Sequence, residues 1–239
     1  KQLEKLQETF EPEEYIDLEK GIFLGLAGFE REPKFVPQHV FSGAHASVLG
    51  ISGTGKSSLV GVLLSQLAGA GEGVIVFDPK PDDKLPRVLM RSAKRFNVPF
   101  AFINLNVPQP QINPFLGCTS SQVADLLESG LGLGVTGNPA VDYHRGADRE
   151  AVGFLADAMS DGATSLPEIV ALAAGDERVT NQDNLWRGMR ELTRVKAACA
   201  PQGAGPDLRE VIDRGGILYV AGSSTDLKIA AVQKMILQR

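Results

Sequence analysis

A glycine-rich run, Gly50–Ser57, joins a short apolar segment, Ala46–Leu49, to a segment rich in leucine and valine, Lys56–Leu67. The run fits the pattern G-x-x-x-x-G-K-[S/T] at every fixed position. In this pattern the glycines let successive backbone N–H groups turn inward around phosphate oxygens, and the following helix adds the positive end of its dipole. The sequence therefore predicts a strand, a phosphate-binding loop and a helix, and the binding of a nucleoside triphosphate.

Each part of this phosphate loop has an expected role. Lys56 would reach the β- and γ-phosphates and is the expected catalytic residue, and the Ser57 hydroxyl would hold Mg²⁺. ATP and Mg²⁺ are therefore the expected cofactors; the alternative is a glycine turn that caps a helix without a ligand. The expected nucleotide-binding residues are Gly50, Ser52, Gly53, Thr54, Gly55, Lys56, Ser57 and Ser58.

Apolar runs alternate with helical segments on both sides of the loop, which is typical of an α/β core with a parallel sheet. The expected strands lie within Gly21–Gly28 and at Ala46–Leu49, Val74–Phe77, Phe100–Ile103 and Ile217–Val220. The expected helices are Lys56–Leu67, Lys84–Phe96, Asp207–Asp213 and one that begins at Asp226.

The pattern changes between residues 120 and 200, where we find no convincing strand and apolar residues recur at helical spacing. We therefore expect an α/β domain formed by residues 21–119 and 205–239, an all-helical insertion at 120–204, and an acidic lead segment at 1–20. The helices expected in the insertion are Ser121–Leu133, Arg149–Met159, Leu166–Ala174 and Asn181–Cys199.

Composition excludes several classes of protein. With 43% hydrophobic and 22% charged residues the chain is too apolar for a disordered protein, and its two cysteines cannot form a disulfide scaffold or a zinc cluster. No run approaches the roughly 18 apolar residues of a membrane-spanning helix. The net charge is −5, most of it in the lead segment, so no bulk basic surface for nucleic acid is expected. We expect a soluble, intracellular chain with no metal site besides that for Mg²⁺.

One acid follows an apolar strand, as the magnesium-supporting acid of phosphate-loop enzymes does. Asp78 comes directly after Val74–Phe77, whereas Ile217–Val220 ends in Ala221-Gly222-Ser223. The residues leave two roles open for Asp78: a magnesium ligand, or a cap for the loop that continues through Pro79.

Arginines on one helix face and near one glycine-rich loop could contact phosphates. The face lies opposite the apolar stripe of the expected helix Asn181–Cys199. The glycine loop, Gly132–Gly137, has G-x-G-x-x-G spacing but lacks the strand-then-helix context of a dinucleotide site. Each set is either solvated surface or a contact to the phosphates of a neighbouring subunit or of a DNA strand. The candidates are Arg145, Arg149, Arg187, Arg190 and Arg194.

These motifs are similar to those of a known family. Gly50–Ser57 followed by Val74–Lys80 resembles the FtsK–HerA class of hexameric DNA-pumping ATPases. Asn113-Pro-Phe115, the helical insertion and Gly215–Val220 resemble the conjugative coupling proteins of type IV secretion (TraD/TraG type). The resemblance covers Ile22–Arg239 and implies a RecA-like P-loop NTPase fold.

The resemblance implies an ATPase motor that moves DNA, or a protein–DNA complex, through a ring of subunits. The implied partners are further copies of the chain in a hexameric ring, DNA, and secretion substrate proteins with their adaptors. The implied location is the cytoplasm, with the full-length protein anchored at the bacterial inner membrane by a segment outside this sequence.

In that family the strand that ends in the magnesium acid lies beyond the helix that begins at Asp226. The resemblance therefore implies that Asp78 is not this acid, that the sequence is truncated, and that the fragment alone hydrolyses almost no ATP. A catalytic arginine would come from a neighbouring subunit.

Two alternative functions stay open. The chain could be a nucleotide-gated recruitment platform for secretion substrates, with slow turnover; the near-neutral charge of residues 21–239 and the helical insertion favour this. It could also be an FtsK/HerA-type translocase of double-stranded DNA. The strand at Val74–Phe77 with Asp78-Pro79-Lys80 favours a motor.

Overall fold

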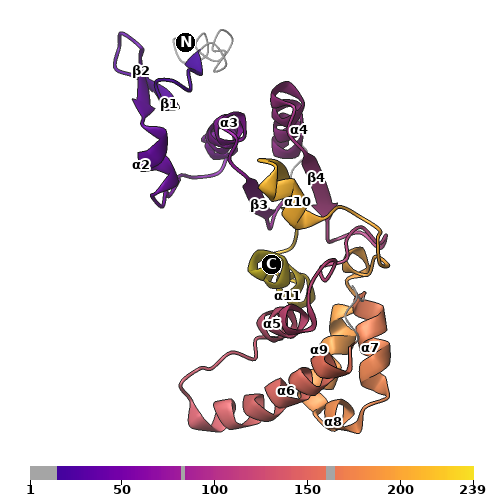
Figure 1. Ribbon diagram of the computed structural model, residues 1–239. Helices are drawn as coiled ribbons and strands as arrows, with labels where there is room; N and C mark the ends of the chain where they lie inside the picture. Colours follow the sequence, from indigo (N-terminus) through magenta and orange to yellow (C-terminus); the bar gives the residue numbers. More distant parts are fainter. Residues whose placement is uncertain (1–14, 82–83, 160–164) are drawn as a thin grey trace. The chain divides into compact units, whose positions relative to one another are not determined.

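The computed structural model describes residues 15–81, 84–159 and 165–239 (Figure 1). Its contacts divide the chain into two compact units, which we describe separately. The first unit consists of Lys1–Ile75, Asp82–Phe100 and Glu210–Ile217. The second consists of Val76–Pro81, Ala101–Arg209 and Leu218–Arg239. The domain boundaries expected from the sequence stay a prediction.

A parallel sheet of three strands forms the centre of the α/β fold. The strands are β3 (Val74–Asp78), β4 (Phe100–Asn104) and β5 (Ile217–Ala221), in the order β3-β5-β4. All five residues of β5 are buried, as the continuous apolar run Ile217–Val220 predicts for the central strand of a parallel sheet. The α/β fold class predicted from the sequence is therefore confirmed.

The first unit contains a hairpin and a helix pair. The elements are β1 (Ile22–Ala27) and β2 (Glu32–Val36), which pair antiparallel, α2 (Gln38–Ser42), α3 (Lys56–Gly69) and α4 (Lys84–Phe96). The side-chain amide of Gln66 on α3, fully buried, accepts from the Phe23 N–H at 2.7 Å and donates to the Phe23 carbonyl at 3.0 Å. This pair of hydrogen bonds fixes the hairpin on α3.

Helices α3 and α4 approach closely because small residues line their contact. A Cβ on Gly69 would lie 2.7 Å from the Phe96 ring, and the Ser65 and Ser92 hydroxyls are 2.7 Å apart. Helix α3, whose first residue is the lysine of the phosphate loop, is thus packed on α4 through its second half.

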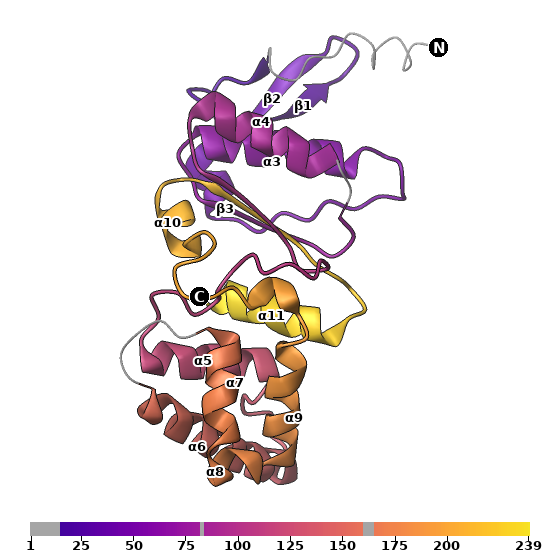
Figure 2. The same ribbon diagram turned by 90° about the vertical axis from the view of Figure 1, so that its right-hand side faces the viewer.

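The second unit is mainly helical. Figure 2 shows α5, α6, α7, α8 and α9 gathered in one bundle, and α11 against α5. The helices are α5 (Ser120–Leu131), α6 (Pro139–Ala158), α7 (Leu166–Ala174), α8 (Glu177–Thr180), α9 (Asp183–Leu192), the 3₁₀ turn η2 (Lys196–Ala198) and α11 (Leu227–Gln238). The remaining short helix, α10 (Leu208–Asp213), has its first two residues in the second unit and its last four in the first.

Local signals explain where these helices begin. Thr119 and Gln122 form a capping box at α5, and Asn138 caps α6 with Pro139 in its first turn. Asp226 caps α11 by accepting from the N–H groups of Lys228 and Ile229.

The structure corrects two of the expected elements and adds one that was not expected. Ala46–Leu49 is not a strand: Leu49 is 90% exposed, and no strand of the described chain pairs with this segment. Strand β2 was missed because its residues include Pro33 and charged side chains. Helix α6 begins at Pro139, ten residues before the expected Arg149, because Asn138 caps it and Pro139 suits its first turn. The expectation did not use this cap.

The expected helix Asn181–Cys199 is also wrong as a continuous element. Helix α9 ends at Leu192, and the chain then turns so that the Ala197 carbonyl accepts from the N–H groups of Gln111 and Ile112, at 2.8 and 2.9 Å. These long-range hydrogen bonds hold the segment after α9 in its turned path. In the part of the chain that the structure describes, no helix is long and apolar enough to cross a membrane.

Candidate nucleotide-binding site

The phosphate loop has a backbone that glycine makes possible. Gly53 and Gly55 have φ angles of +83° and +85°, in the left-handed region where a Cβ is strained. A Cβ on Gly50 would lie 2.7 Å from Thr54 Oγ1, whose hydroxyl donates to the Ile51 carbonyl at 2.8 Å. The loop is thus held in a tight turn that leads directly into α3.

The start of α3 offers hydrogen-bond donors to an anion. Gly55 is the N-cap residue and no side chain caps the helix, so its first N–H groups remain for a ligand. Within the described residues, the Ser57 and Ser58 hydroxyls make no hydrogen bond, and both residues are exposed. This set of backbone N–H groups and hydroxyls fits phosphate oxygens and a Mg²⁺ ion.

Lys56 curls back over the loop. Its Nζ donates to the carbonyls of Gly50 at 2.8 Å and Ile51 at 2.7 Å. An ammonium group has three N–H donors, so one remains to reach a phosphate. The lysine therefore lies over the loop, within which the phosphates are expected.

A groove of about 370 Å³ runs between α3 and α4 and begins at the phosphate loop. Ser57 and Ser58 lie at one end and Phe96 at the other, and Val62, Leu85 and Val88 form apolar walls. Its mainly apolar walls suit a non-phosphate part of a ligand better than the phosphates.

The eight expected loop residues all belong to the first unit. They are Gly50, Ser52, Gly53, Thr54, Gly55, Lys56, Ser57 and Ser58.

Both carboxylate oxygens of Asp78 have partners within the second unit. Oδ1 accepts from the Lys80 N–H at 2.9 Å, which forms the turn after β3, and Oδ2 accepts from the hydroxyl of buried Tyr219. The Gly222 N–H donates to the Asp78 carbonyl at 2.8 Å. This geometry supports the interpretation of Asp78 as a structural cap. Tyr219 could not be identified from the sequence, because nothing in the pattern marks a buried tyrosine as a hydrogen-bond donor.

Arg145 and Arg149 hold the glycine loop. Arg145 donates to the Gly134 carbonyl at 2.8 Å, and Arg149 to the Leu133 carbonyl at 2.7 Å. From the other side Asp142 accepts from Thr136 at 2.7 Å. Hydrogen bonds from the Thr136 N–H and hydroxyl, and from the Gly137 N–H, hold the pKa of Asp142 below its usual value. A local bracing role accounts for both arginines.

The remaining arginine candidates do not share one helix face. Arg187 donates to Asn184 Oδ1 at 2.9 Å, and Arg190 lies over the Trp186 ring at 5.8 Å, both on α9. Arg194 lies beyond the end of α9 and pairs with Glu191 at 2.8 Å. The expected common face is therefore corrected to two arginines on the helix and one in the turn that follows it.

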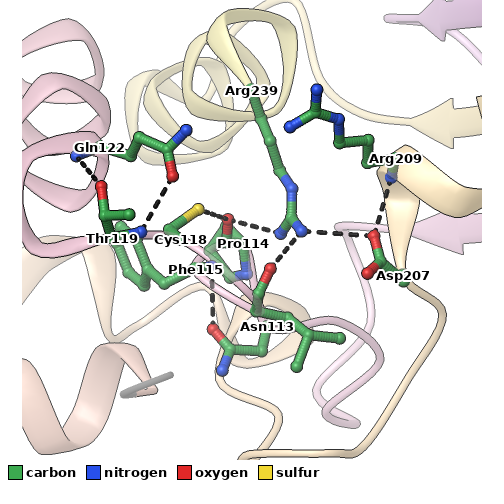
Figure 3. Close-up of polar contacts among 10 residues, drawn as sticks. Asn113, Pro114, Phe115, Cys118, Thr119, Gln122, Asp207, Arg209 and Arg239 are labelled. Carbon is green, nitrogen blue, oxygen red and sulfur yellow. Dashed lines mark hydrogen bonds and ion pairs between the residues drawn. The ribbon is translucent and has the colours of Figure 1, made fainter. Parts of the chain in front are cut away.

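Arg239 organises a cluster that the sequence did not reveal (Figure 3). Its side chain is 8% exposed, donates to the carbonyls of Pro114, at 3.0 Å, and Leu116, and pairs with Asp207 at 3.3 Å. Asn113 Oδ1 accepts from the Phe115 N–H at 3.0 Å, so the Asn113-Pro-Phe115 motif forms a folded turn beneath α11. These contacts are structural.

The two cysteines are poor nucleophiles. Burial raises the pKa of the Cys118 and Cys199 thiols, which therefore stay protonated near neutral pH. Among the described residues, no group of three or more histidine, cysteine, aspartate or glutamate side chains could hold a metal ion.

Comparisons with known proteins agree with the phosphate loop and the fold. Residues 40–82 match the family model described as helicase HerA, central domain. Among solved structures, the chain is similar to VirB4 of Thermoanaerobacter pseudethanolicus, with a TM-score of 0.54 and 16% sequence identity. The similarity covers 93% of this chain and 63% of the VirB4 chain. No curated protein matches the sequence.

The fold and the loop define the class: an α/β fold of the P-loop NTPase type with a G-x-x-x-x-G-K-[S/T] loop. The comparisons confirm the resemblance to the FtsK/HerA-like ATPases that the motifs predicted, through HerA for the loop segment and through VirB4 for the fold.

Proposed function

We propose that this chain is the ATP-binding motor domain of a coupling ATPase that moves DNA or protein in a conjugative or type IV secretion system. The observation that carries the proposal is the phosphate loop itself. Its glycines adopt left-handed backbone conformations, its helix is uncapped by any side chain, and its lysine and two serines offer donors to an anion. The similarities to HerA and VirB4 support the assignment to this class of motor.

In this proposal the backbone N–H groups at the start of α3 and the Lys56 ammonium hold the β- and γ-phosphates of ATP. The Ser57 hydroxyl would hold Mg²⁺, which would supply positive charge next to the phosphates. Lys56 exchanges its hydrogen bonds to the Gly50 and Ile51 carbonyls for bonds to phosphate oxygens. The chain positions the phosphates and stabilises charge on them, and performs no covalent step.

Hydrolysis needs more than this loop provides. Asp78 is engaged by Lys80 and Tyr219, so a different acid would support the magnesium, and an arginine from a neighbouring copy would stabilise the transition state. Such an arginine contributes roughly 10³–10⁵ in rate in related phosphoryl transfers. We therefore propose a homo-oligomeric ring, a hexamer by the resemblance, and slow turnover by the isolated chain.

The partners and the location follow from the same resemblance. DNA and secretion substrate proteins with their adaptors are the proposed cargo, and the cytoplasmic face of a bacterial inner membrane is the proposed location. VirB4 is longer than the matched region, since this chain covers 63% of it, so these assignments concern the whole protein.

Phosphate release by the whole protein that contains this chain, followed with malachite green over a range of protein concentrations, tests the proposal. A motor should show ATP turnover that rises with protein concentration, increases on addition of DNA, and disappears in Lys56→Ala. Lys94→Ala, an exposed lysine on α4 outside the loop, is the matched control and should behave as the wild type. Turnover that persists in Lys56→Ala would contradict the proposed site.

Two further functions remain candidates. The helical bundle of the second unit favours a nucleotide-gated recruitment platform, because the bundle could dock secretion substrates. Such a platform should bind ATP, and DNA should not change its rate of ATP turnover. An FtsK/HerA-type translocase of double-stranded DNA is favoured by the HerA match at residues 40–82, and duplex DNA should then stimulate turnover more than single strands.

A further inference from the structure

A basic hollow lies in the second unit, at the carboxyl ends of β4 and β5. It has a volume of about 490 Å³, within the range of roughly 300–1,000 Å³ that is typical of ligand sites. In open α/β sheets, ligands bind where the carboxyl ends of strands meet. The hollow shares no residue with the phosphate loop. Its lining residues are Leu105, Asn106, Val107, Pro108, Arg194, Val195, Lys196, Ser223, Thr225, Asp226, Lys228 and Ile229.

The walls of the hollow are tied together by hydrogen bonds. Asn106 Nδ2 donates to the Gly222 carbonyl at 2.9 Å and to Asn104 Oδ1 at 3.1 Å, which joins the loop after β4 to the loop after β5. Ser223 Oγ accepts from the N–H groups of Thr225 and Asp226 at 3.2 and 3.1 Å. The hollow is thus formed by ordered loops.

Positive charge predominates in the lining. Arg194, Lys196 and Lys228 come from two separate segments, and Asp226 is the single lining carboxylate. Lys196 is exposed and forms no ion pair within the described residues. This local excess of positive charge occurs in a chain whose net charge is −5.

The ion pairs at the hollow leave its cations able to bind an anion. Arg194 pairs with Glu191, and Lys228 with Asp226 at 3.2 Å, but the Arg194 side chain is 65% exposed and that of Lys228 is 37% exposed. Solvated pairs of this kind contribute little to stability, so an anion can replace the carboxylate partner.

We propose that this hollow binds phosphate groups. Arginine, lysine, serine, threonine and asparagine are the side chains that contact phosphates in nucleic-acid complexes, and the hollow contains all five types. No aromatic side chain is among its lining residues, so the expected contacts are to phosphates and not to stacked bases. A nucleic-acid backbone and a free nucleotide both present this chemistry, and the experiment separates them.

The test compares two variants that each lose three positive charges. The hollow variant is Arg194→Gln/Lys196→Gln/Lys228→Gln. The control, Lys94→Gln/Arg214→Gln/Lys234→Gln, removes exposed cations on α4, just after α10 and on α11, all outside the hollow. Far-UV circular dichroism and thermal unfolding verify that both variants fold as the wild type does.

Fluorescence anisotropy of a labelled oligothymidylate, titrated with each protein over a range of salt concentrations, gives the affinity and its salt dependence. We expect the hollow variant to bind at least tenfold more weakly than the control. The slope of log K against log salt should become shallower by about 0.7 for each phosphate that the variant no longer neutralises. ATP and inorganic phosphate serve as competitors.

The outcomes are distinct. Loss of oligothymidylate binding in the hollow variant alone identifies a nucleic-acid backbone as the ligand. The second outcome concerns ATP, whose binding is measured in a Lys56→Ala background. If the hollow variant alone loses ATP binding while its oligothymidylate binding is unchanged, the ligand is a nucleotide. Equal binding by the hollow and control variants overturns the proposal. Because Lys56 lies outside the hollow, failure of the proposed ATP site would leave this comparison unaffected.

Discussion

Removing one buried hydroxyl, that of Tyr219, should destabilise the second unit. Tyr219 on β5 is fully buried, and its hydroxyl donates to Asp78 Oδ2 at the end of β3. The Tyr219 ring also stacks on Phe102, with 5.6 Å between the ring centroids. Tyr219→Phe keeps this stacking and removes only the hydrogen bond.

The size of the effect follows from the charge on the acceptor. A hydrogen bond to a charged group contributes about 1.5–3 kcal/mol, and a carboxylate oxygen left without its donor is costly when it is partly buried. Tyr219→Phe should therefore lower the free energy of unfolding by about 2 kcal/mol. For a chain of this length that corresponds to a decrease in Tm of roughly 4–8 °C.

Urea unfolding followed by circular dichroism measures this change. Tyr143→Phe, at an exposed tyrosine, is the control and should have no effect. A double-mutant cycle with Asp78→Asn isolates the coupling between the two side chains. A Tyr219→Phe variant as stable as the wild type, or a coupling energy near zero, would refute the role of Asp78 as a structural cap.

Three further substitutions test local features of the second unit. Gly130→Ala places a Cβ 2.6 Å from Met235 Cγ and should cost about 1–3 kcal/mol in urea unfolding, whereas Gly134→Ala, which meets nothing within 4 Å, should cost far less. Burial raises the pKa of Asp148, so its ionised form is disfavoured in the fold. Near pH 3, below the unfolded-state pKa, Asp148→Asn should therefore have about the same free energy of unfolding as the wild type. As pH rises through the folded-state pKa, the variant should become more stable than the wild type, because it has no buried carboxyl to ionise. Arg149→Gln removes a hydrogen bond to the glycine loop and should speed cleavage there in limited proteolysis; an unchanged cleavage rate would show that the arginine does not brace the loop.

The elements that sequence predicted well are those with strong local signals. The Val74–Phe77 and Ile217–Val220 runs form strands because continuous apolar runs suit a buried parallel sheet, and Lys84–Phe96 forms a helix over the expected residues. The phosphate loop was recognisable because each of its positions has a separate steric or chemical requirement.

The errors have long-range causes. The helix expected at Asn181–Cys199 ends at Leu192, and the chain turns to place the Ala197 carbonyl against the N–H groups of Gln111 and Ile112, a contact that no local pattern indicates. In the same way, the bracing role of Arg145 depends on its contact with a carbonyl eleven residues earlier in the sequence.

The central claim is that the Gly50–Ser57 loop binds the phosphates of a nucleotide, and isothermal titration with ATP·Mg²⁺ tests it most directly. Lys56 is only partly buried, and its two hydrogen bonds go to carbonyls of its own loop, so Lys56→Ala should fold as the wild type does. In the Arg194→Gln/Lys196→Gln/Lys228→Gln background, which lacks the cations of the hollow, we expect saturable binding that Lys94→Ala retains and a folded Lys56→Ala variant loses. Equal affinity with and without Lys56 in that background would contradict the claim.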